Sequence, residues 1–517
     1  MPARYNRVIW WIKRDARIAD NEALTAAVLH SESVLPLFVF EVSVQTASDA
    51  SIFHAHAQWC AVNSLSNSIK ELGGSVQFAT GEIDTVLDTL FQSDGFDAIY
   101  SHEETGTDIT YSRDLKVAAW CIKNNVAWLQ CSQNGVVRKL SSRDDRSKIV
   151  KQRLLETKPF QQPKKIVSWQ STTLLSEIPA FDSLNVRQSH CQPIFDRVQY
   201  VTEHQAVEDC LEFLHSRGIG YSGGISSPNS AFKAGSRLSA HLAWGTISLR
   251  TVFSLSNQRL RALSQSSGGS TSQWVKSIRA FQARLFWHDH FVQRLESAPE
   301  MEFQALNPAY QSIAYFDDPE IKDAWLNGRT GIPLVDACMR CLKATGFLNF
   351  RMRAMVVTTA CYGLGQSWIS IQDPLARTFL DYEPGIHLSQ IQMQAGIVGI
   401  NTIRVYSPLK QLLDHDPQCI FVKKWVPELR EFDASTIACY ETRKLGNYPL
   451  PILDIQEMGK LMKNQIYSIR NSQEGKKASA AVLLEHGSRR STSRRVNARK
   501  KREPNDKSDS PQLTLDF

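Results

Sequence analysis

The segment Val8-Ile9-Trp10-Trp11-Ile12-Lys13-Arg14-Asp15 opens with five apolar residues and ends on three charged ones. Four similar apolar runs follow, separated by stretches with the spacing of amphipathic helices; the runs are Val34–Phe40, Val76–Ala79, Ala98–Ser101 and Ala127–Cys131. Strands that alternate with helices indicate a parallel, doubly wound sheet. The sequence therefore predicts an α/β domain over residues 1–135.

The helices between these strands are expected over Asn21–Leu29, Ala55–Leu72, Ile83–Phe91 and Ser112–Asn124. Asp20 or Asn21 should cap the first helix, because both side chains accept hydrogen bonds from free backbone N–H groups, and Glu22 falls in its first turn. No Gly-x-Gly-x-x-Gly pattern follows the first strand. A standard dinucleotide site is therefore not expected in this domain.

The rest of the chain divides into a connector, a helical domain and a tail. Residues 136–205 are rich in Lys, Arg, Ser, Gln and Pro, which favours a long surface connector, ordered only in part. Residues 206–470 carry helical periodicity, most clearly over Ser272–Glu296. Residues 471–517 contain too few apolar residues to form a core, so the sequence predicts a disordered basic tail.

Composition narrows the class of protein. The chain has 517 residues, 42% of them hydrophobic and 21% charged, which is ordinary for a globular protein of two domains. The longest early apolar run, Val8–Ile12, is too short for a signal peptide or a membrane span. Ten scattered cysteines suit a reducing compartment. We therefore expect a cytoplasmic monomer without a membrane segment.

One cysteine pair needs a separate interpretation. Cys338 and Cys341 form a Cys-x-x-Cys pair inside an expected helix, on its apolar stripe. A metal or iron–sulfur site would need two further ligands, and no second Cys pair exists. We expect both thiols to pack in the core, and no metal.

The segment Gly235–Leu242 has the composition of an anion site. Small residues, hydroxyls and Arg237 stand where a helix is expected to begin, so backbone N–H groups and a guanidinium can meet phosphate oxygens. A capped helix start with an incidental Arg explains this segment alone about as well.

A set of motifs in fixed order resembles the photolyase and cryptochrome family. The resemblance covers about residues 5–435, without the connector, and rests on Trp11–Asn21, Gly235–Leu242, Trp325–Ala337, Ala344–Arg353, Arg404–Pro408, Asp414–Pro417 and Trp425–Leu429. It implies an antenna domain followed by a helical domain that binds a folded FAD. It also implies a second, antenna chromophore. Glu103 and Glu104 lie near its expected site, but two glutamates are too generic to identify the chromophore.

The resemblance also implies which residues hold the FAD. Its phosphates would lie against Tyr221, Ser236, Arg237, Leu238 and Ser239. Arg353 would pair with Asp381 beside the flavin ring, and a buried guanidinium independently requires such a carboxylate. An ordinary ion pair away from any ligand is the alternative. Glu383 would lie at the adenine or ribose side.

Near the flavin ring the sequence departs from the family's pattern. His387 stands where the family usually carries Asn, Asp or Cys facing the flavin N5, and there it could exchange a proton near neutral pH. A histidine satisfied by a neighbouring carbonyl is the alternative. Of the family's three electron-relaying tryptophans, Trp368 matches the middle one, the proximal position is Ile391, and the outer one lies near Tyr315. The usual relay is therefore expected to be interrupted.

The DNA-facing residues implied by the resemblance are Arg284, Trp287, His288, Phe350 and Arg351. Trp287 would support a lesion flipped out of the duplex, whereas core packing is the alternative for a Trp on a long helix. Arg284 stands where repair enzymes typically carry Glu, and Phe350 where they carry Asn or His. The two histidines that mark repair of (6-4) lesions are absent, since their positions are Phe350 and Ala354.

The function expected from these residues is blue-light-driven repair of cyclobutane pyrimidine dimers in damaged DNA, with Trp287, His387 and Trp368 as the candidate catalytic residues. A cryptochrome-type light sensor without repair is the main alternative, and a light-independent DNA-binding flavoprotein is a third. In the tail, Gln512–Phe517 resembles the short peptide by which bacterial repair proteins dock onto the sliding clamp. The clamp is therefore a further expected partner.

Overall fold

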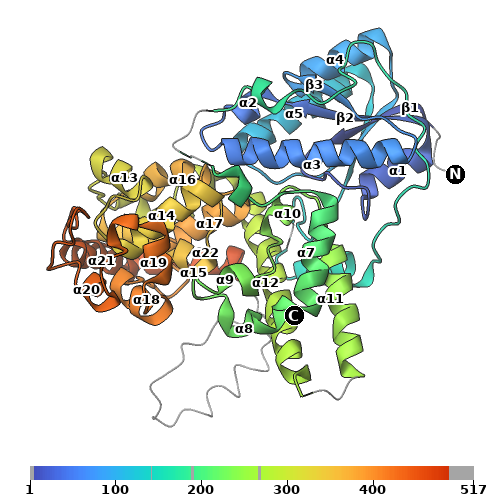
Figure 1. Cartoon of the computed structure of the whole chain (residues 1–517). Helices are drawn as coiled ribbons and strands as arrows, with labels where there is room; N and C mark the ends of the chain where they lie inside the picture. The colour runs from blue at the N-terminus through green and yellow to red at the C-terminus, as the bar shows by residue number, and fades with distance from the viewer. Residues whose placement is uncertain (1–4, 141, 188–190, 192, 266–268, 488–517) are drawn as a thin grey trace.

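The structure is a computed structural model that describes residues 5–140, 142–187, 191, 193–265 and 269–487. An α/β domain forms one end of the molecule and a larger helical domain the other (Figure 1). The expected clamp peptide, Gln512–Phe517, lies outside the described residues. Among the described helices, none is both long and apolar enough to cross a membrane.

The α/β domain is built on a five-stranded sheet in the order β3-β2-β1-β4-β5, and every pairing is parallel. The strands are β1 (Tyr5–Ile12), β2 (Ser31–Phe40), β3 (Gln77–Thr80), β4 (Ala98–His102) and β5 (Ala127–Cys131). Strands β2 and β3 extend the sheet on one side of β1, and β4 and β5 extend it on the other side, so the strand order reverses between β1 and β4. This confirms the predicted doubly wound sheet, and such a reversal creates a crevice at the carboxyl ends of the strands.

Helices cover both faces of the sheet (Figure 1). Alternate β1 side chains explain this, because Trp10 packs with α1 and α3 in one cluster, whereas Trp11 packs with α4 and α5 in another. The helices are α1 (Glu22–His30), α2 (Val42–Gln45), α3 (Ile52–Glu71), α4 (Ile83–Ser93) and α5 (Asp108–Asn124). Asn21 caps α1, accepting a hydrogen bond from the Leu24 N–H at 2.9 Å, as the sequence predicted.

The connector passes along the α/β domain before it reaches the helical domain. It contains α6 (Arg146–Lys151), a π-helical turn (Gln152–Glu156) and two short 3-10 turns, Phe181–Ser183 and Phe195–Arg197. Ser168 pairs with Val34 of β2, and Leu175 with Phe78 of β3. Val150 and Leu154 pack into the core of the helical domain. The connector is therefore anchored to both domains.

The helical domain wraps around one long helix, α12 (Thr271–Ser297), which confirms the stripe expected over Ser272–Glu296. Before it come α7 (Glu203–His215), α8 (Tyr221–Gly224), α9 (Ala231–Ala234), α10 (Ser239–Ala243) and α11 (Leu249–Ser264). After it come α13 (Pro319–Leu326), α14 (Pro333–Thr345), α15 (Phe350–Thr358), α16 (Trp368–Ala376), α17 (Pro384–Gln394), α18 (Pro408–His415), α19 (Ile420–Trp425), α20 (Ala434–Ala438), α21 (Ile455–Asn471) and α22 (Gln473–His486). Short 3-10 turns at Arg217–Gly220, Pro299–Glu302, Pro308–Ser312 and Pro427–Leu429, and a π-helical turn at Thr359–Gly363, complete the domain.

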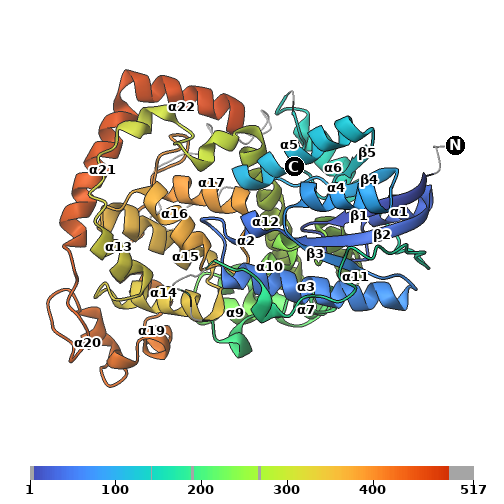
Figure 2. The ribbon, with the colours of Figure 1, turned by 90° about the horizontal axis from the view of Figure 1, so that it is seen from above.

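The tail begins later than the sequence predicted. Disorder was expected from residue 471, but residues 473–486 form α22, which turns at Ser472 and runs along the edge of the domain (Figure 2). Ser472 caps it by accepting from the Gly475 N–H, and Val482 packs with Leu295 of α12. Asn307 Nδ2 also donates to Ser479 Oγ of α22 at 3.1 Å. An apolar anchor, a cap and a side-chain hydrogen bond therefore hold a helix that has little apolar surface of its own.

The two domains meet through tight polar contacts. Arg17 of the α/β domain donates to the Gly245 carbonyl at 2.9 Å, and Glu203 of α7 accepts from the Ile18 and Ala19 N–H groups. At Gly245, which has a φ of +70°, a Cβ would lie 1.9 Å from the Arg14 carbonyl oxygen. Glycine is therefore required for this close approach.

Cys338 and Cys341 lie fully buried on α14 in the largest core cluster. Burial raises the pKa of the Cys341 thiol to about 12 and that of Cys338 well above its ordinary value. Neutral buried thiols pack as small apolar groups, which is the role expected for this pair.

Candidate functional site

The expected pair of Arg353 and Asp381 forms in the structure. Arg353, on α15, donates from Nη2 to Asp381 Oδ2 at 2.8 Å and from Nε to the Leu348 carbonyl at 2.5 Å. The Asp381 side chain is 5% exposed, and its Oδ1 has no hydrogen-bond partner among the described residues. One carboxylate oxygen thus fixes the guanidinium and the other remains an available acceptor.

Phe347 links this pair to the expected phosphate segment, and sequence reasoning missed it. The Arg237 guanidinium lies 4.6 Å from the centre of the Phe347 ring, and the Arg353 guanidinium lies 5.7 Å from it. Both distances are within the range of cation–π attraction. Segments more than a hundred residues apart in sequence therefore meet around one aromatic ring.

The phosphate segment has the backbone of an anion site. Arg237 has a φ of +63°, and Leu238 follows in the right-handed region, an alternation that turns successive N–H groups toward one concave side. On the other side, Gln199 donates to the Arg237 carbonyl at 2.8 Å and Arg217 donates to the Ser236 carbonyl at 2.9 Å. The carbonyl oxygens are thus occupied, which leaves the N–H side of the turn available.

The side chains of this segment divide into two kinds. Leu238 is buried and anchors the turn in the core, whereas Ser239, the first residue of α10, is exposed and Ser236 is half-buried. The Arg237 Nε is buried without a partner among the described residues, and burial lowers the pKa of this guanidinium. Arg237 therefore lies in the structure as a buried cation with donor capacity to spare.

Tyr221, Arg284 and Trp287 form a second group beside α12. Tyr221 is buried at the start of α8 and shares a hydrogen bond with Arg284; burial raises the pKa of this phenol to about 12. The Arg284 guanidinium lies 4.3 Å from the centre of the Trp287 ring. Trp287 is half-buried, and its buried Nε1 has no hydrogen-bond partner within the described part of the chain. Trp287 is thus held by a cation on one side and is not absorbed into the core.

Glu383 and His288 lie together between the domains. Arg14 Nη2 of the α/β domain is 4.0 Å from Glu383 Oε2, and burial raises the pKa of Glu383 while Arg14 and His288 oppose the rise. The His288 side chain is 14% exposed, and its Nδ1 is 3.6 Å from Asp289 Oδ1. His288 therefore offers little surface for the DNA contact that the resemblance implied.

His387 is buried, and its Nε2 donates to the Gln372 carbonyl at 2.8 Å. Burial lowers the pKa of this imidazole to about 4, so it is neutral at neutral pH. Of the two interpretations of the sequence, the structure contains the hydrogen bond to a neighbouring carbonyl. A contact between His387 and the flavin N5 stays a prediction.

The three positions of the interrupted electron relay share one core cluster. Trp368 and Ile391 are buried there, and Tyr315 packs against them from the edge. Tyr362 lies in the same cluster, and burial raises the pKa of both tyrosine phenols well above the ordinary value. Aromatic side chains therefore share the core cluster of Trp368, although the proximal position carries Ile391.

Phe350 and Arg351 begin α15, one turn before Arg353. The Phe350 side chain is 51% exposed, and the Arg351 Nε is buried without a partner among the described residues. A large exposed ring beside a guanidinium suits contact with a base and a phosphate. Phe350 thus has the exposure that the DNA-binding prediction requires, whereas Arg351 is half-buried, and a DNA contact of either residue stays a prediction.

Several buried polar atoms around this site have no partner among the described residues, namely Arg237 Nε, Asp381 Oδ1, Asn349 Oδ1 and Trp287 Nε1. Asn349 was also missed from the sequence; its Nδ2 donates to the Ile225 and Ser226 carbonyls, at 3.1 and 2.9 Å. Buried polar atoms are normally paired, because an unpaired one costs about 1–3 kcal/mol. This mixture of free donors and acceptors fits a large polar cofactor.

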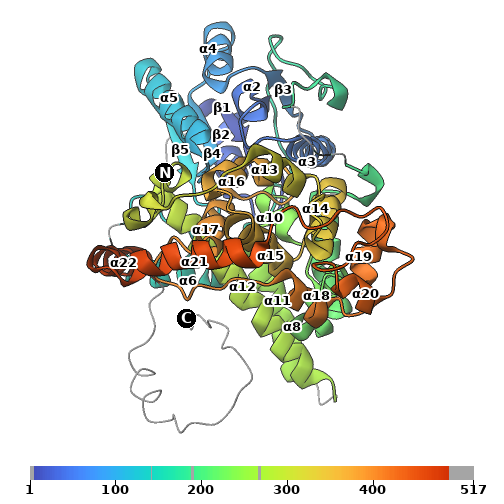
Figure 3. The ribbon, with the colours of Figure 1, turned by 90° about the vertical axis from the view of Figure 1, so that its left-hand side faces the viewer.

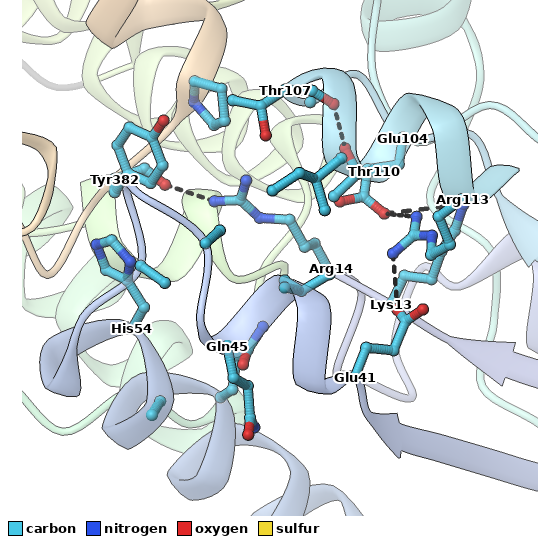
Figure 4. Close-up of a pocket in the computed structure, with 18 of the residues that line it drawn as sticks. Lys13, Arg14, Glu41, Gln45, His54, Glu104, Thr107, Thr110, Arg113 and Tyr382 are labelled. Atoms are coloured by element: carbon cyan, nitrogen blue, oxygen red, sulfur yellow. Dashed lines mark hydrogen bonds and ion pairs between the residues drawn. The ribbon is translucent and has the colours of Figure 1, made fainter. Parts of the chain in front are cut away.

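A second candidate site lies at the carboxyl edge of the sheet, near the reversal between β1 and β4. The cavity there is about 100 Å³, and its lining comes from both domains, with Lys13, Arg14 and Glu41 at the ends of β1 and β2, Arg113 on α5, and Trp244 and Tyr382 from the helical domain. Figure 4 shows Arg14 extending across the cavity toward Tyr382, whose carbonyl it contacts at 2.5 Å. Glu104 lines the cavity and Glu103 does not.

The charges in this second site neutralise one another. Arg113 donates to Glu41 at 3.0 Å, to Glu104 at 2.7 Å and to Asp114 at 2.8 Å, and Lys13 is 3.2 Å from Asp114. These carboxylates raise the pKa of Arg113 well above its ordinary value, despite its burial. Burial raises the pKa of Glu41 to about 7. The charged groups are thus paired, but Glu41 Oε1, both amide atoms of Gln45 and Ser51 Oγ are buried without a hydrogen-bond partner among the described residues, so a ligand there would meet free polar groups.

Comparison with known protein families separates the same two domains. Residues 8–151 match the family described as DNA photolyase, and residues 281–468 match the FAD binding domain of DNA photolyase. The second match contains Trp287, Arg353, Asp381 and His387. The chain therefore carries a FAD-binding domain, and it belongs to the photolyase and cryptochrome family.

Individual relatives agree with this assignment. The chain is 26% identical over 473 residues to a deoxyribodipyrimidine photo-lyase of Agrobacterium fabrum, covering 86% of this chain and 95% of that protein. It is 23% identical to a chloroplastic/mitochondrial cryptochrome DASH of Solanum lycopersicum, covering 82% of this chain and 77% of that protein. The relatives thus include proteins of both names.

The fold also agrees with a solved structure. The archaeal photolyase of Sulfolobus tokodaii, solved with two FAD molecules, superposes with a TM-score of 0.73 at 23% identity, covering 89% of this chain and 99% of that one. The order of the two domains and the parallel sheet are therefore those of the family.

Proposed function

We propose that this protein binds DNA containing cyclobutane pyrimidine dimers and splits the dimers under blue light. The observation that carries the proposal is Trp287, a half-buried ring on α12 with Arg284 at 4.3 Å, in a domain that binds FAD. A flipped-out base can stack on such a ring, and a stack contributes about 1–3 kcal/mol. The Agrobacterium photo-lyase supports the same activity by similarity.

In this proposal the residues of the chain bind and orient the cofactor and the lesion. The turn at Ser236–Ser239 and Arg237 hold the cofactor phosphates, and Arg353 and Asp381 hold the ring end. When bound and reduced, FAD supplies the excited electron that opens the dimer ring and afterwards recovers it. His387 remains neutral, and its Nε2–H donates to the Gln372 carbonyl.

The test is direct repair by the purified protein. Protein loaded with FAD and chemically reduced is illuminated with dimer-containing oligonucleotide, and the restored thymine is measured against a dark control. Restoration in the light alone is expected. Full flavin content without any restored thymine would contradict the repair function.

A light sensor without repair is the second candidate. Two departures favour it: Arg284 and Phe350 replace groups with which repair enzymes hydrogen-bond the damaged bases, and cryptochromes occur among the relatives. Photoreduction of the bound flavin without restored thymine would select this function.

We also propose that the sheet-edge cavity binds the second chromophore. The related Sulfolobus photolyase contains two FAD molecules, and here the cavity is lined by both domains. Its charges are already paired, so such binding would rest on ring contacts with Trp244 and Tyr382 and on hydrogen bonds with the unpartnered side chains of Gln45 and Ser51. Chromatography of the released chromophores tests this, since more than one chromophore per chain is expected.

The sliding-clamp interaction of Gln512–Phe517 is a separate proposal from the sequence. Deletion of residues 512–517 should abolish clamp binding in a calorimetric titration and leave flavin content unchanged. The intact chain should bind with a Kd of about tens of micromolar, because a short peptide loses ordering entropy on binding. Absence of binding by the intact chain in that range would contradict the proposal.

A further inference from the structure

Helix α5 carries an apolar stripe on its surface. Tyr111 and Leu115 are each 56% exposed and Ile122 is 83% exposed, and the half-buried Ala118 lies between Leu115 and Ile122. The four positions follow a 4-3-4 spacing, which places them on one face of the helix and is the spacing of the contact seam between paired helices. A contiguous row of exposed apolar side chains indicates a contact surface.

The stripe lies on the flank of α5 that points away from α4. On the opposite flank, the Trp120 ring lies 5.6 Å from the Phe91 ring of α4, and Trp120 Nε1 donates to Asp88 at 3.1 Å. Between the two flanks, Val117 and Cys121 pack on the sheet. Figure 3 shows α5 at the outer side of the α/β domain, with α4 next to it and β5 beneath it. The stripe therefore faces the edge of the sheet that β5 forms.

The two edges of the sheet differ in how they are covered. At β3, the Phe78 N–H donates to the Leu175 carbonyl of the connector at 2.9 Å, and the Leu175 N–H donates to the Phe78 carbonyl at 2.9 Å. At β5, the backbone hydrogen bonds found among the described residues go only to β4 and to the residues next to it. Strand β5 also has no proline and no charged side chain, which commonly keep edge strands from pairing. Within the described part of the chain, β5 is therefore an open edge.

The stripe is complementary to a second copy of itself. A 4-3-4 spacing is the same in both directions, so an antiparallel copy of α5 places Tyr111 against Ile122 and Leu115 against Ala118 of the second copy. A large side chain then meets a small one near the centre, which allows the helices to approach closely. The two-fold axis that pairs the helices also brings two β5 strands together in antiparallel orientation, and such a pairing completes an open edge.

The charges at the two ends of α5 favour the antiparallel arrangement. Asp108 is exposed in the first turn of the helix, and Lys123 is exposed in the last turn. In an antiparallel pair the first turn of one helix meets the last turn of the other, so Asp108 of each copy lies beside Lys123 of the other copy. A parallel pair would instead place like charges together at both ends.

We propose that α5 and β5 form the two-fold interface of a homodimer. A second copy of this chain is the occupant that matches the symmetric stripe, the opposite charges at the helix ends and the open strand edge at once. One helix face and one strand edge per subunit make a small interface, of about 1,000 Å² in total, so the dimer forms reversibly with a Kd of about 10 μM. This assembly differs from the monomer that the sequence led us to expect.

The first experiment is sedimentation velocity of the full chain loaded with FAD, from about 1 to 200 μM, a range that spans the expected Kd. The mass should rise from that of one chain to that of two. Leu115→Glu places a charge in the seam and should remain a monomer throughout, with unchanged flavin content. Leu461→Glu is the matched control, because Leu461 on α21 is 55% exposed, and it should dimerise as the wild type does. A wild type that stays monomeric, as expected if residues 488–517 or another protein cover the stripe, would overturn the proposal, and so would a dimeric Leu115→Glu.

The second experiment tests the antiparallel arrangement by exchanging charges. Asp108→Lys and Lys123→Asp should each weaken self-association by at least about threefold, because like charges then meet at both ends of the helix pair. An equimolar mixture of the two variants should associate more tightly than either variant alone, since every end contact in the mixed dimer joins opposite charges. The mixture is measured by the same sedimentation method. A mixture that associates no better than the separate variants would overturn the antiparallel interface.

Discussion

Arg113 and Arg237 are both buried guanidinium groups, one in each domain, and their surroundings differ. Arg113 donates to three carboxylates at 2.7–3.0 Å, which raise its pKa well above the ordinary value. Among the described residues, Arg237 has a 3.4 Å contact to Gln199 Oε1 and lies against two aromatic rings, and burial lowers its pKa although Asp209 and Asp381 oppose the shift. A cation whose charge is balanced within the chain stabilises the fold, whereas one left unbalanced is available for an anionic ligand.

Arg113→Met should give the largest effect on stability. The substitution removes the ion-pair partner of Glu41 and leaves Glu104 and Asp114 with Lys13 and with Arg138, which is 3.6 Å from Asp114. Breaking a buried ion pair costs about 3–5 kcal/mol. Urea unfolding should show this loss in the free energy of unfolding, with unchanged flavin per folded molecule. If Arg113→Met also lost flavin per folded molecule, Arg113 would not differ from Arg237 in its role.

Arg237→Ala should have the opposite effect, with weaker FAD binding and unchanged stability of the protein. The cofactor phosphates keep their charge and lose a guanidinium, which is worth about 1.5–3 kcal/mol, so FAD should bind about ten- to a hundredfold more weakly. The protein without FAD should keep its Tm, because the unpaired buried charge is removed. Arg197→Ala is the matched control for charge, because Arg197 is exposed and lines the same surface pocket as Arg237. A fully yellow, stable Arg237→Ala protein would exclude this phosphate site.

Trp287→Ala should weaken binding to damaged DNA more than binding to intact DNA. Stacking serves only an extruded lesion, whereas phosphate contacts serve both DNAs, so affinity for dimer-containing duplex should fall about tenfold more than affinity for intact duplex. Trp274→Phe is the control on the same helix, since Trp274 is buried in the core. Equal losses on the two DNAs would exclude Trp287 from the lesion pocket.

Local sequence patterns predicted much of this architecture. The five strands, the Asn21 cap and the long helix α12 depend on periodicity and single side chains, which a sequence displays directly. The Arg353–Asp381 pair was predicted from the family resemblance, and the need of a buried guanidinium for a carboxylate agreed with that prediction. Helix α22 was missed because its anchors, Val482 and the Ser472 cap, act through contacts with distant residues.

The parts of the sites that the sequence did not predict are formed by residues that lie far apart in the chain and meet only in the folded structure. Phe347 has no spacing signature that would place it between Arg237 and Arg353. His288 was expected at the DNA surface, but the turn of α12 directs it to Asp289 and Glu383.

His387 is a neutral buried group, in contrast to the charged Arg113 and Arg237. Its titration should have the smallest effect of these predictions. Its pKa of about 4 lies below the unfolded value of about 6.5, so below pH 6.5 the unfolded chain binds the proton that the native chain excludes. Its contribution to stability is therefore complete above pH 6.5 and is lost progressively toward pH 4. At pH 5.5 the loss is about 1 kcal/mol.

His387→Gln keeps a donor for the Gln372 carbonyl and removes the titration. The free energies of unfolding of the wild type and the variant should therefore converge by about 1 kcal/mol between pH 7 and pH 5.5, measured by urea unfolding. His54 and His486 also have lowered pKa values, of about 3 and 4, but they are present in both proteins and cancel in the difference. His204→Gln, at a residue whose side chain is 81% exposed, is the control and should show no such convergence. A constant difference between wild type and His387→Gln would mean that His387 does not titrate as a buried neutral group, and would restore proton exchange at the flavin as its interpretation.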